Sequence, residues 1–198
     1  MKMVMKMMFM FFKTKKFLPY DCYRTIFDID YRKLYQLGKR VILIDIDNTL
    51  VPYDRDLPER RHLELIDEIK TLGFQIIFIS NNHKERVEKI ALAFDVDYVY
   101  SACKPLKKGF KKALTKANYQ TKSEVLTIGD QVVTDVLGSN LYQLDAILVK
   151  PIKKKNEKWY TKVNRIAENI IIKRMLKQYP AMALKIINLR GETIENQM

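Results

Sequence analysis

Two aspartates, Asp45 and Asp47, end an apolar run of strand composition in the stretch VILIDIDNTLVPYD, which begins at Val41. Side chains alternate between the two faces of a strand, so residues two apart point the same way. Two carboxylates held side by side repel each other unless a cation lies between them. The pair therefore has two interpretations. It either ends a strand and caps a helix, or it surrounds a metal ion and a substrate.

Polar residues of a related kind follow three other apolar runs. Ser80 ends FQIIFIS, Lys104 lies just beyond YVYSA, and Asp130 and Asp135 lie at the end of VLTIGD and in GDQVVTD. A phosphoryl group needs neutralisation, positioning and a nucleophile, and a carboxylate can be that nucleophile. A second acid can protonate the leaving oxygen, and a hydroxyl and an ammonium can hold phosphate oxygens. Mg²⁺ prefers oxygen ligands. These residue types indicate Mg²⁺-assisted phosphoryl transfer.

The elements that must position these residues alternate along the middle of the chain. Apolar runs rich in β-branched residues begin at Val41, Phe74, Tyr98, Val125 and Ala146, and each predicts a strand. Stretches with helical spacing lie between them, at 57–73, 83–94, 106–119 and 132–144. Strands too apolar to have a wet face, alternating with helices, predict an α/β fold with a mostly parallel sheet covered on both sides. Ligand sites of such sheets lie at the carboxyl ends of the strands.

The order of the motifs resembles that of the haloacid dehalogenase (HAD) superfamily. The residues that carry the resemblance are DIDNT at 45–49, Ser80, KP at 104–105 and GDQVVTD at 129–135, and together they span about 41–150. The resemblance implies a Rossmann-like fold and Mg²⁺ as the cofactor. It implies that Asp45 is the nucleophile and Asp47 the general acid/base. An Asp rather than a Thr two residues after the nucleophile implies rapid hydrolysis, and hence a phosphatase.

The same resemblance implies the binding residues. The predicted phosphate-binding residues are Ser80, Asn81, Lys104 and Thr49, where Thr49 also supports its loop. For Asn81, capping of the following helix is the alternative. The predicted metal ligands are Asp45, Asp47 through its backbone carbonyl, Asp130 and Asp135. Neither insertion point used for a cap domain in this superfamily has room for one, because LVPYDRDLP leads straight into a helix and YSACKP is short. We therefore expect a capless, open site with only a small flap.

The charge of the chain is concentrated at its two ends. Of the formal net charge of +13, residues 1–40 carry +7, residues 41–150 carry −1, and residues 151–198 carry +7. We expect a basic N-terminal extension over 1–40, a phosphatase core over 41–152, and a basic helical extension over 153–198 that packs on the core. Basic ends of this kind favour an anionic partner, either a membrane surface or nucleic acid.

Both basic ends allow a membrane interpretation and a plainer one. The start, MKMVMKMMFMFFKTKK, is too short and too interrupted for a membrane span, so it is either an interfacial anchor or a disordered segment. The last segment places apolar residues at helical spacing among lysines and arginines: Trp159, Val163, Ile166, Ile170 and Leu176. Such a stripe binds a membrane surface or packs on the domain. His62 is expected on the surface of its helix.

The substrate prediction comes from a narrower resemblance. The segment KFLPYDCYRTIFDIDYRKLYQLGKR at 16–40, the DIDNTL motif and the capless layout resemble the YqeG-like (subfamily IIIA) phosphatases. Their mitochondrial relatives convert phosphatidylglycerophosphate to phosphatidylglycerol. This implies a lipid-borne substrate and a cytoplasmic enzyme that binds the inner face of the membrane peripherally. A soluble phosphatase of nucleotides, nucleic-acid ends or phosphoproteins is the first alternative. A non-catalytic RNA-binding module is the second, which the intact Asp45–Asp47 pair disfavours.

Overall fold

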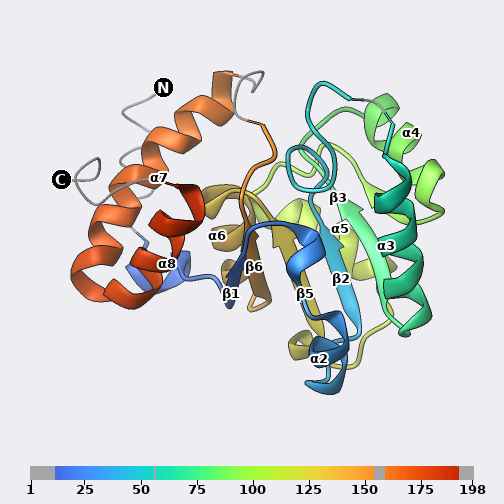
Figure 1. The fold of residues 1–198 in the computed structure, drawn as a ribbon, viewed down its shortest axis with the longest axis horizontal. Helices are drawn as coiled ribbons and strands as arrows, with labels where there is room; N and C mark the ends of the chain where they lie inside the picture. Colours follow the sequence, from blue (N-terminus) through green and yellow to red (C-terminus); the bar gives the residue numbers. More distant parts are fainter. Residues whose placement is uncertain (1–11, 56, 154–158, 192–198) are drawn as a thin grey trace.

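A six-stranded sheet forms the centre of the molecule, with helices on both faces (Figure 1). The structure, a computed structural model, describes residues 12–55, 57–153 and 159–191, and for 159–166 the backbone alone. The strand order is β1-β6-β5-β2-β3-β4, and each pairing is parallel. The strands are β1 Asp21–Tyr23, β2 Val41–Ile44, β3 Gln75–Ile79, β4 Asp97–Val99, β5 Val125–Gly129 and β6 Asp145–Val149. The predicted α/β, Rossmann-like architecture is confirmed.

The sheet is buried on both faces, which explains why its strands are apolar without alternation. In β2, Ile42 and Ile44 pack in the core beneath α2 (Tyr31–Gln36), α3 (Arg60–Thr71) and α4 (Lys84–Phe94). Val41 and Leu43, which point the other way, pack with Phe110 of α5 (Lys107–Lys116). Because neighbouring residues serve opposite faces, every position of β2 is buried.

The predicted helices form between the predicted strands. Gly73, expected to stop the first of them, follows α3 with a φ of 98°, a backbone conformation that glycine adopts without strain. The last predicted helix, over 132–144, is divided. A π-helical turn, η4 (Val132–Val136), leads directly into α6 (Leu137–Leu141). This irregularity falls on Asp135, one of the predicted metal ligands.

The edge strand β1 was not predicted. Asp21–Tyr23, expected to belong to the N-terminal extension, pairs in parallel with Ile147–Val149 of β6. A strand of three residues gives too short a pattern to recognise, and its pairing partner lies more than 120 residues away. The residues that follow β1 form a short 3-10 turn, η2 (Ile26–Asp28), which begins with Thr25 as its cap.

The prediction that His62 lies on the surface of its helix was wrong. His62 is only 3% exposed, and its ring lies 5.2 Å from that of Phe27 in η2, measured between centroids. The spacing of apolar residues within α3 could not reveal this contact, because the covering residue comes from a segment before the first predicted strand.

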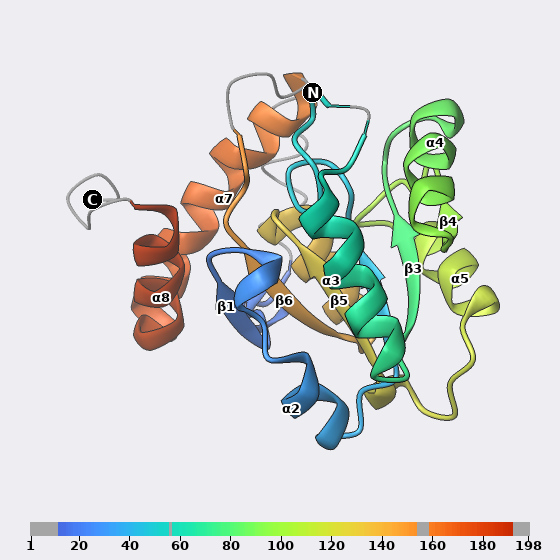
Figure 2. The ribbon, with the colours of Figure 1, turned by 45° about the vertical axis from the view of Figure 1, so that its right-hand side comes forward.

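Two C-terminal helices, α7 (Trp159–Gln178) and α8 (Pro180–Arg190), pack beside the β1 edge of the sheet (Figures 1 and 2). In α7 the apolar residues Ile171, Ile172 and Met175 are fully buried, and they belong to the same core cluster as Val132, Val133 and Val136 of η4. Of the predicted stripe, Ile170 and Leu176 are half-buried. The side chains of Trp159, Val163 and Ile166 lie outside the described part.

No helix in the described part of the chain is long and apolar enough to cross a membrane. The predicted interfacial segment at the start of the chain lies mostly outside the described residues, as do Lys154, Lys155 and Lys158.

A buried ion pair joins α7 to α8 and to the core. Arg190 Nη2 lies 2.5 Å from Glu168 Oε2, with side-chain exposures of 6% and 0%. Glu168 also accepts a hydrogen bond of 3.4 Å from the backbone N–H of Val133 in η4. The carboxylate of Glu168 therefore ties the C-terminal helices to the segment that carries Asp135.

Removing one partner of this pair should destabilise the fold strongly. Arg190→Met leaves the Glu168 charge buried without its cation, which typically costs about 3–5 kcal/mol of unfolding free energy. The matched control is Lys185→Met, which breaks the half-exposed pair with Asp21 and should cost at most about 1 kcal/mol. Urea denaturation followed by circular dichroism measures both. Equal losses in the two variants would contradict the structural role of Glu168.

Candidate active site

Asp45, the predicted nucleophile, lies where β2 passes into a turn. Asp45 continues the strand, since its N–H donates to the Ile128 carbonyl at 2.9 Å. Asn48 then takes a left-handed conformation with a φ of 64°, which asparagine tolerates better than most residues. Its backbone N–H donates to the Val51 carbonyl and its side-chain oxygen accepts from the N–H of Tyr53. The chain thereby folds back over the strand end and forms a small flap, residues 48–55.

The carboxylate of Asp45 is buried among charged groups. Lys104 Nζ lies 2.6 Å from Asp45 Oδ1, and Thr49 Oγ1 lies 3.3 Å from Asp45 Oδ2. Burial raises the pKa of Asp45 well above its usual range. Lys104 opposes that effect, and the charges of Asp135 and Asp130 add to it. The site therefore favours a further cation close to this carboxylate.

Asp45, Asp130 and Asp135 form a cluster in which one carboxylate oxygen of each lies within 4.8 Å of the others. Lys104 Nζ bridges two of them, at 2.6 Å from both Asp45 Oδ1 and Asp135 Oδ1. Burial alone would lower the pKa of Lys104, but Asp135 and Asp45 outweigh it and raise that pKa, so the ammonium stays charged. Three buried carboxylate donors with one cation among them fit a hard divalent metal ion such as Mg²⁺.

Local backbone geometry brings Asp135 into this cluster. The π-helical turn of η4 displaces the side chain at its fourth position relative to a regular helix, and such turns are frequent at functional sites. Gly129 at the end of β5 provides the space, because a Cβ placed there would lie 2.3 Å from Asp135 Cγ. The backbone N–H of Gln131 and the hydroxyl of Thr134 each donate to Asp135 Oδ2 at 3.1 Å.

Asp47 faces away from this cluster. Its Oδ2 accepts from Ser80 Oγ at 3.3 Å and from Asn82 Nδ2 at 3.2 Å, and its Oδ1 accepts from Arg86 Nε at 2.8 Å. The side chain of Asp47 is therefore not among the clustered metal donors. The sequence analysis assigned only its backbone carbonyl to the metal. Its carboxylate is instead held by Ser80, Asn82 and Arg86.

Arg86 and Asn82 are two residues of the site that were not predicted. Arg86 comes from the first turn of α4, and its guanidinium also donates to the Pro52 carbonyl and lies over the ring of Tyr53. It thus links the acid/base candidate to the flap. The sequence offered one indication of Arg86: it is a basic residue in the first turn of the helix that follows β3. That signal is weak, because the same helix also carries Lys84 and Lys89.

The predicted phosphate-binding residues take different positions. Ser80 and Lys104 lie at the site, and both are buried. Thr49 Oγ1 reaches towards Asp130 Oδ1 at 3.5 Å as well as towards Asp45. The side chain of Asn81 neither caps α4 nor reaches the carboxylates. Its amide accepts from the Lys104 N–H at 2.7 Å and donates to the Lys104 carbonyl at 3.1 Å, which fixes the Lys104 loop.

No inserted domain covers this edge in the described part of the chain. The link from β2 to α3 consists of the flap and the residues up to Glu59, and the link from β4 to α5 runs over 100–106. Both links are therefore short in the described part of the chain.

The role of Gly129 can be tested without measuring activity. In Gly129→Ala the added Cβ must push Asp135 out of the cluster, so Mg²⁺ affinity measured by calorimetry should fall by about tenfold or more. Gly138→Ala is the control, since its Cβ would meet Phe110 rather than a carboxylate. Both variants should lose thermal stability. Unchanged Mg²⁺ affinity in Gly129→Ala would show that Asp135 does not belong to the metal site.

The sequence of this chain is similar to those of known proteins over most of its length. A model of the haloacid dehalogenase-like hydrolases matches residues 23–140. The protein named "Probable phosphatase YqeG" from Bacillus subtilis (strain 168) is 34% identical over 164 residues, which cover 83% of this chain and 94% of that protein.

Two solved structures are more distant. A protein from Listeria monocytogenes serotype 4b is 18% identical, with a TM-score of 0.48 over 60% of this chain and 84% of that one. The HAD hydrolase YfnB from Bacillus subtilis, solved with bound magnesium, is 16% identical, with a TM-score of 0.46 over 60% of this chain and 90% of that one.

The family match spans the whole stretch from Asp45 to Asp135, and the relative that this chain covers almost completely is named a phosphatase. The chain therefore belongs to the haloacid dehalogenase-like hydrolases and is a phosphatase of that family.

Proposed function

We propose that this phosphatase is a Mg²⁺-dependent phosphomonoester hydrolase that acts through an aspartyl-phosphate on Asp45, and that its substrate is a membrane lipid phosphate. Phosphatidylglycerophosphate, hydrolysed to phosphatidylglycerol, is the substrate we favour. One observation carries the lipid assignment: the open edge that holds Asp45 is also bordered by exposed apolar side chains and lysines.

In the first step, an oxygen of Asp45 attacks the phosphorus of the substrate. The bond from phosphorus to the ester oxygen breaks, and Asp47 gives a proton to the departing alcohol. The hydroxyl of Ser80 and the ammonium of Lys104 lie close enough to hold the non-bridging phosphate oxygens. Arg86 and Asn82 keep the Asp47 carboxylate directed towards the leaving group.

In the second step, Asp47 takes a proton from a water molecule. The water oxygen attacks phosphorus, the bond from phosphorus to Asp45 breaks, and inorganic phosphate leaves with the original carboxylate restored. Asp45, Asp130 and Asp135 would hold Mg²⁺, together with the backbone carbonyl of Asp47. When bound, the ion neutralises charge on the transferring group.

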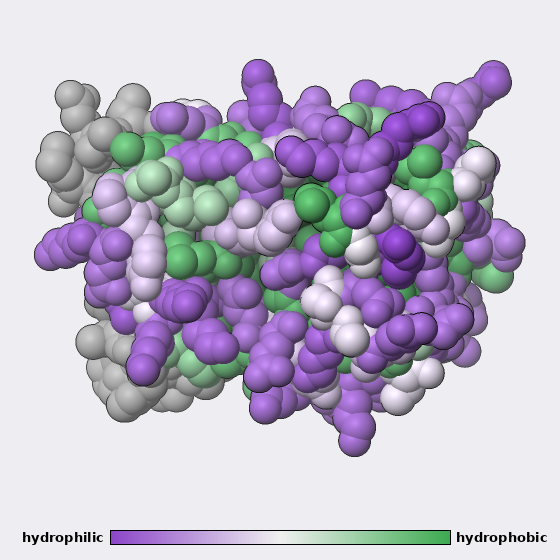
Figure 3. All heavy atoms as spheres, turned by 90° about the horizontal axis from the view of Figure 1, so that it is seen from below, coloured by the Kyte–Doolittle hydropathy of each residue, from purple (hydrophilic) through white to green (hydrophobic). Residues whose placement is uncertain are grey.

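Several exposed apolar side chains lie in the loops at the carboxyl edge of the sheet. Four of the large hydrophobic side chains that are exposed come from loops at the carboxyl edge: Leu57 (61% exposed), Tyr100 (41%), Leu106 (60%) and Ile152 (43%). They lie in the links that follow β2, β4 and β6. Exposed apolar residues grouped around a functional edge are typical of a surface that contacts a membrane or a partner. The opposite face, at the amino ends of the strands, is mainly hydrophilic with scattered apolar side chains (Figure 3).

Basic residues accompany this apolar border. Lys150 and Lys153 follow β6 at the same edge, and Lys153 pairs with Asp54 of the flap at 3.1 Å. The helix α7 begins on this side of the molecule (Figures 1 and 2). Each basic residue close to an anionic lipid surface contributes about 1 kcal/mol of binding free energy. A few such residues with several apolar side chains give reversible, peripheral binding.

Replacement of the nucleophile should abolish turnover without unfolding the protein. Asp45→Asn removes the attacking oxygen but keeps the shape of the side chain, so kcat for a soluble ester such as p-nitrophenyl phosphate should fall by at least about a thousandfold. The unfolding free energy should stay equal or rise, because one charge leaves a crowded buried cluster. Asp54→Asn on the flap surface is the control and should remain active. Activity retained in Asp45→Asn would remove Asp45 from the mechanism.

The lipid assignment is tested by changing the apolar border. Leu57→Ser with Leu106→Ser should lower turnover of phosphatidylglycerophosphate in anionic vesicles about tenfold or more, because less apolar area enters the interface. Turnover of p-nitrophenyl phosphate should not change. The matched control is Leu37→Ser with Leu92→Ser, which alters two equally exposed leucines away from that edge and should affect neither reaction.

A second experiment tests how much the basic residues contribute to membrane binding. Binding of the wild-type chain to anionic vesicles should weaken as salt rises, and neutral vesicles should bind far less. Substitution of Lys153, Lys154, Lys155 and Lys158 by Gln should reduce lipid turnover alone. If the wild-type chain ignores anionic vesicles at low salt, or if both substrates lose turnover equally in the border variant, the soluble phosphatase replaces the lipid enzyme.

A further inference from the structure

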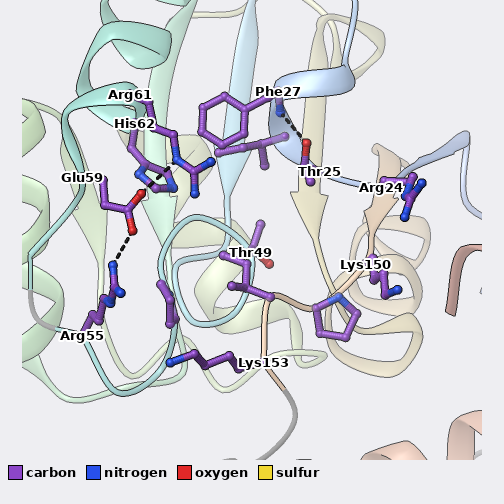
Figure 4. A pocket seen from close by; sticks show the side chains of 14 residues that line it. Arg24, Thr25, Phe27, Thr49, Arg55, Glu59, Arg61, His62, Lys150 and Lys153 are labelled. Atoms are coloured by element: carbon purple, nitrogen blue, oxygen red, sulfur yellow. Dashed lines mark hydrogen bonds and ion pairs between the residues drawn. The ribbon is translucent and has the colours of Figure 1, made fainter. Parts of the chain in front are cut away.

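A pocket of about 400 Å³ lies beside the flap, apart from the catalytic carboxylates (Figure 4). Its walls come from η2, the flap, the start of α3 and the residues after β6. None of Asp45, Asp47, Ser80 and Lys104 lines it. No local pattern in the sequence indicates this pocket, because its four segments are widely separated along the chain.

The charge around this pocket is mainly positive. Five cationic side chains line it, from Arg24, Arg55, Arg61, Lys150 and Lys153, with Glu59 as the acid among the lining residues. Glu59 pairs with both Arg55 and Arg61, and Lys153 pairs with Asp54. For Arg24 and Lys150, the described part of the chain offers no acidic partner. Within the described residues, the pocket thus has two cations, Arg24 and Lys150, that form no ion pair.

A buried imidazole in the pocket wall has one ring nitrogen without a hydrogen bond in the described structure. His62 lines the pocket and is 97% buried, since its exposed fraction is 3%. Its Nδ1 makes no hydrogen bond within the described structure. Buried polar atoms are nearly always satisfied, so an unsatisfied one beside a cavity points to a bound group that supplies the missing contact. Figure 4 shows His62 beside Glu59 and Arg61, with Phe27 nearby.

The remaining walls are apolar. Ile26, Phe27, Pro52, Pro151 and Ile152 contribute to them, and Phe27 and Ile152 are partly exposed at 37% and 43%. A pocket with an apolar lining and cations around it suits a ligand with an organic group and an anionic group. A free metal ion or a cationic ligand would be repelled.

We propose that this pocket is a second anion-binding site, which takes a phosphate group carried on a small apolar organic group. It adjoins the catalytic centre at Thr49, and it does not depend on which ester the enzyme hydrolyses. Thr49 lines the pocket while its hydroxyl lies 3.3 Å from Asp45 Oδ2, so a bound ligand contacts the flap that closes over the nucleophile. The cations bind the phosphate oxygens, and Phe27 and Ile152 contact the organic group.

The two histidines of the chain provide an internal comparison. His62 lines the pocket, whereas His83 is exposed at the start of α4 and does not. Ring signals of both are followed by ¹H–¹³C NMR on the full-length chain in EDTA, which keeps the catalytic centre free of metal. The probes are inorganic phosphate, monomeric dihexanoyl phosphatidic acid and uncharged dihexanoylglycerol. We expect the two phosphate-bearing probes to shift the His62 signal saturably and to leave His83 unchanged.

Comparing inorganic phosphate with the phosphatidic acid tests whether the ligand carries an organic group. Binding of the phosphatidic acid at least about tenfold tighter than inorganic phosphate supports a ligand that carries an organic group. Equal binding of the two would contradict that part of the proposal, because the apolar walls would then contribute nothing. Binding of dihexanoylglycerol as tight as that of the phosphatidic acid would overturn the proposal, because the cations would then contribute nothing. The absence of any shift of His62 with either phosphate probe would also overturn it.

Neighbouring arginines on α3 provide matched variants. Arg61→Gln removes a lining cation, whereas Arg60→Gln removes an exposed arginine that pairs with Glu64 outside the pocket. Loss of a charge-assisted hydrogen bond should weaken phosphate binding about tenfold or more in Arg61→Gln and not in Arg60→Gln. Neither residue contacts the catalytic carboxylates, so both variants should hydrolyse p-nitrophenyl phosphate normally. Equal weakening in the two variants would show non-specific attraction and would contradict a built site.

Discussion

Three buried carboxylates repel one another in the interior of this protein, and the groups around them must offset that repulsion. Asp45, Asp130 and Asp135 come from two strand ends and a helical turn, and they approach within 4.8 Å of one another. In the apolar interior such charges repel strongly, and burial raises the pKa of Asp45. Lys104, at 2.6 Å from two of them, provides one compensating charge. A divalent ion would provide more, and the three carboxylates lie close enough together to hold one.

The scaffold that holds this cluster is rigid where the charges are closest. Parallel pairing aligns β2 with β5, so that their carboxyl ends meet. Gly129 leaves room for Asp135, and the amide of Asn81 fixes the Lys104 loop through two hydrogen bonds. The C-terminal helices contribute through Glu168, which contacts the backbone of the turn that carries Asp135. The apolar core of both sheet faces provides the free energy that keeps the charged groups together.

The sequence predicted the sheet and most of the site because both follow from one rule. Polar residues at the ends of parallel strands meet at one edge, so Asp45, Ser80 and Asp130 could be placed together before any coordinates were known. Arg86 could not, because it lies within a helix where nothing in its spacing separates it from its basic neighbours. The edge strand β1 is too short to give a pattern, and it pairs with a distant strand.

The burial of His62 escaped prediction for a similar reason. Its covering residue, Phe27, belongs to a segment that had no recognisable element. The pocket they share with the flap depends on four such segments meeting in space. Local sequence therefore predicts which catalytic residue types lie at the carboxyl edge of the sheet. Contacts such as that between His62 and Phe27 arise from tertiary packing and could not be predicted in this way.

The most direct test of the central claim is to trap the phosphorylated enzyme. The protein is mixed with excess substrate and Mg²⁺, quenched in acid within one turnover, digested and analysed by mass spectrometry. The account predicts a phosphate on the peptide VILIDIDNTLVPYD, localised to Asp45 by fragmentation and labile to hydroxylamine, as acyl phosphates are. In the Asp47→Asn enzyme this species should persist longer, because water activation is lost. Phosphate on a different residue, or wild-type turnover with no covalent phosphate at any quench time, would contradict the account.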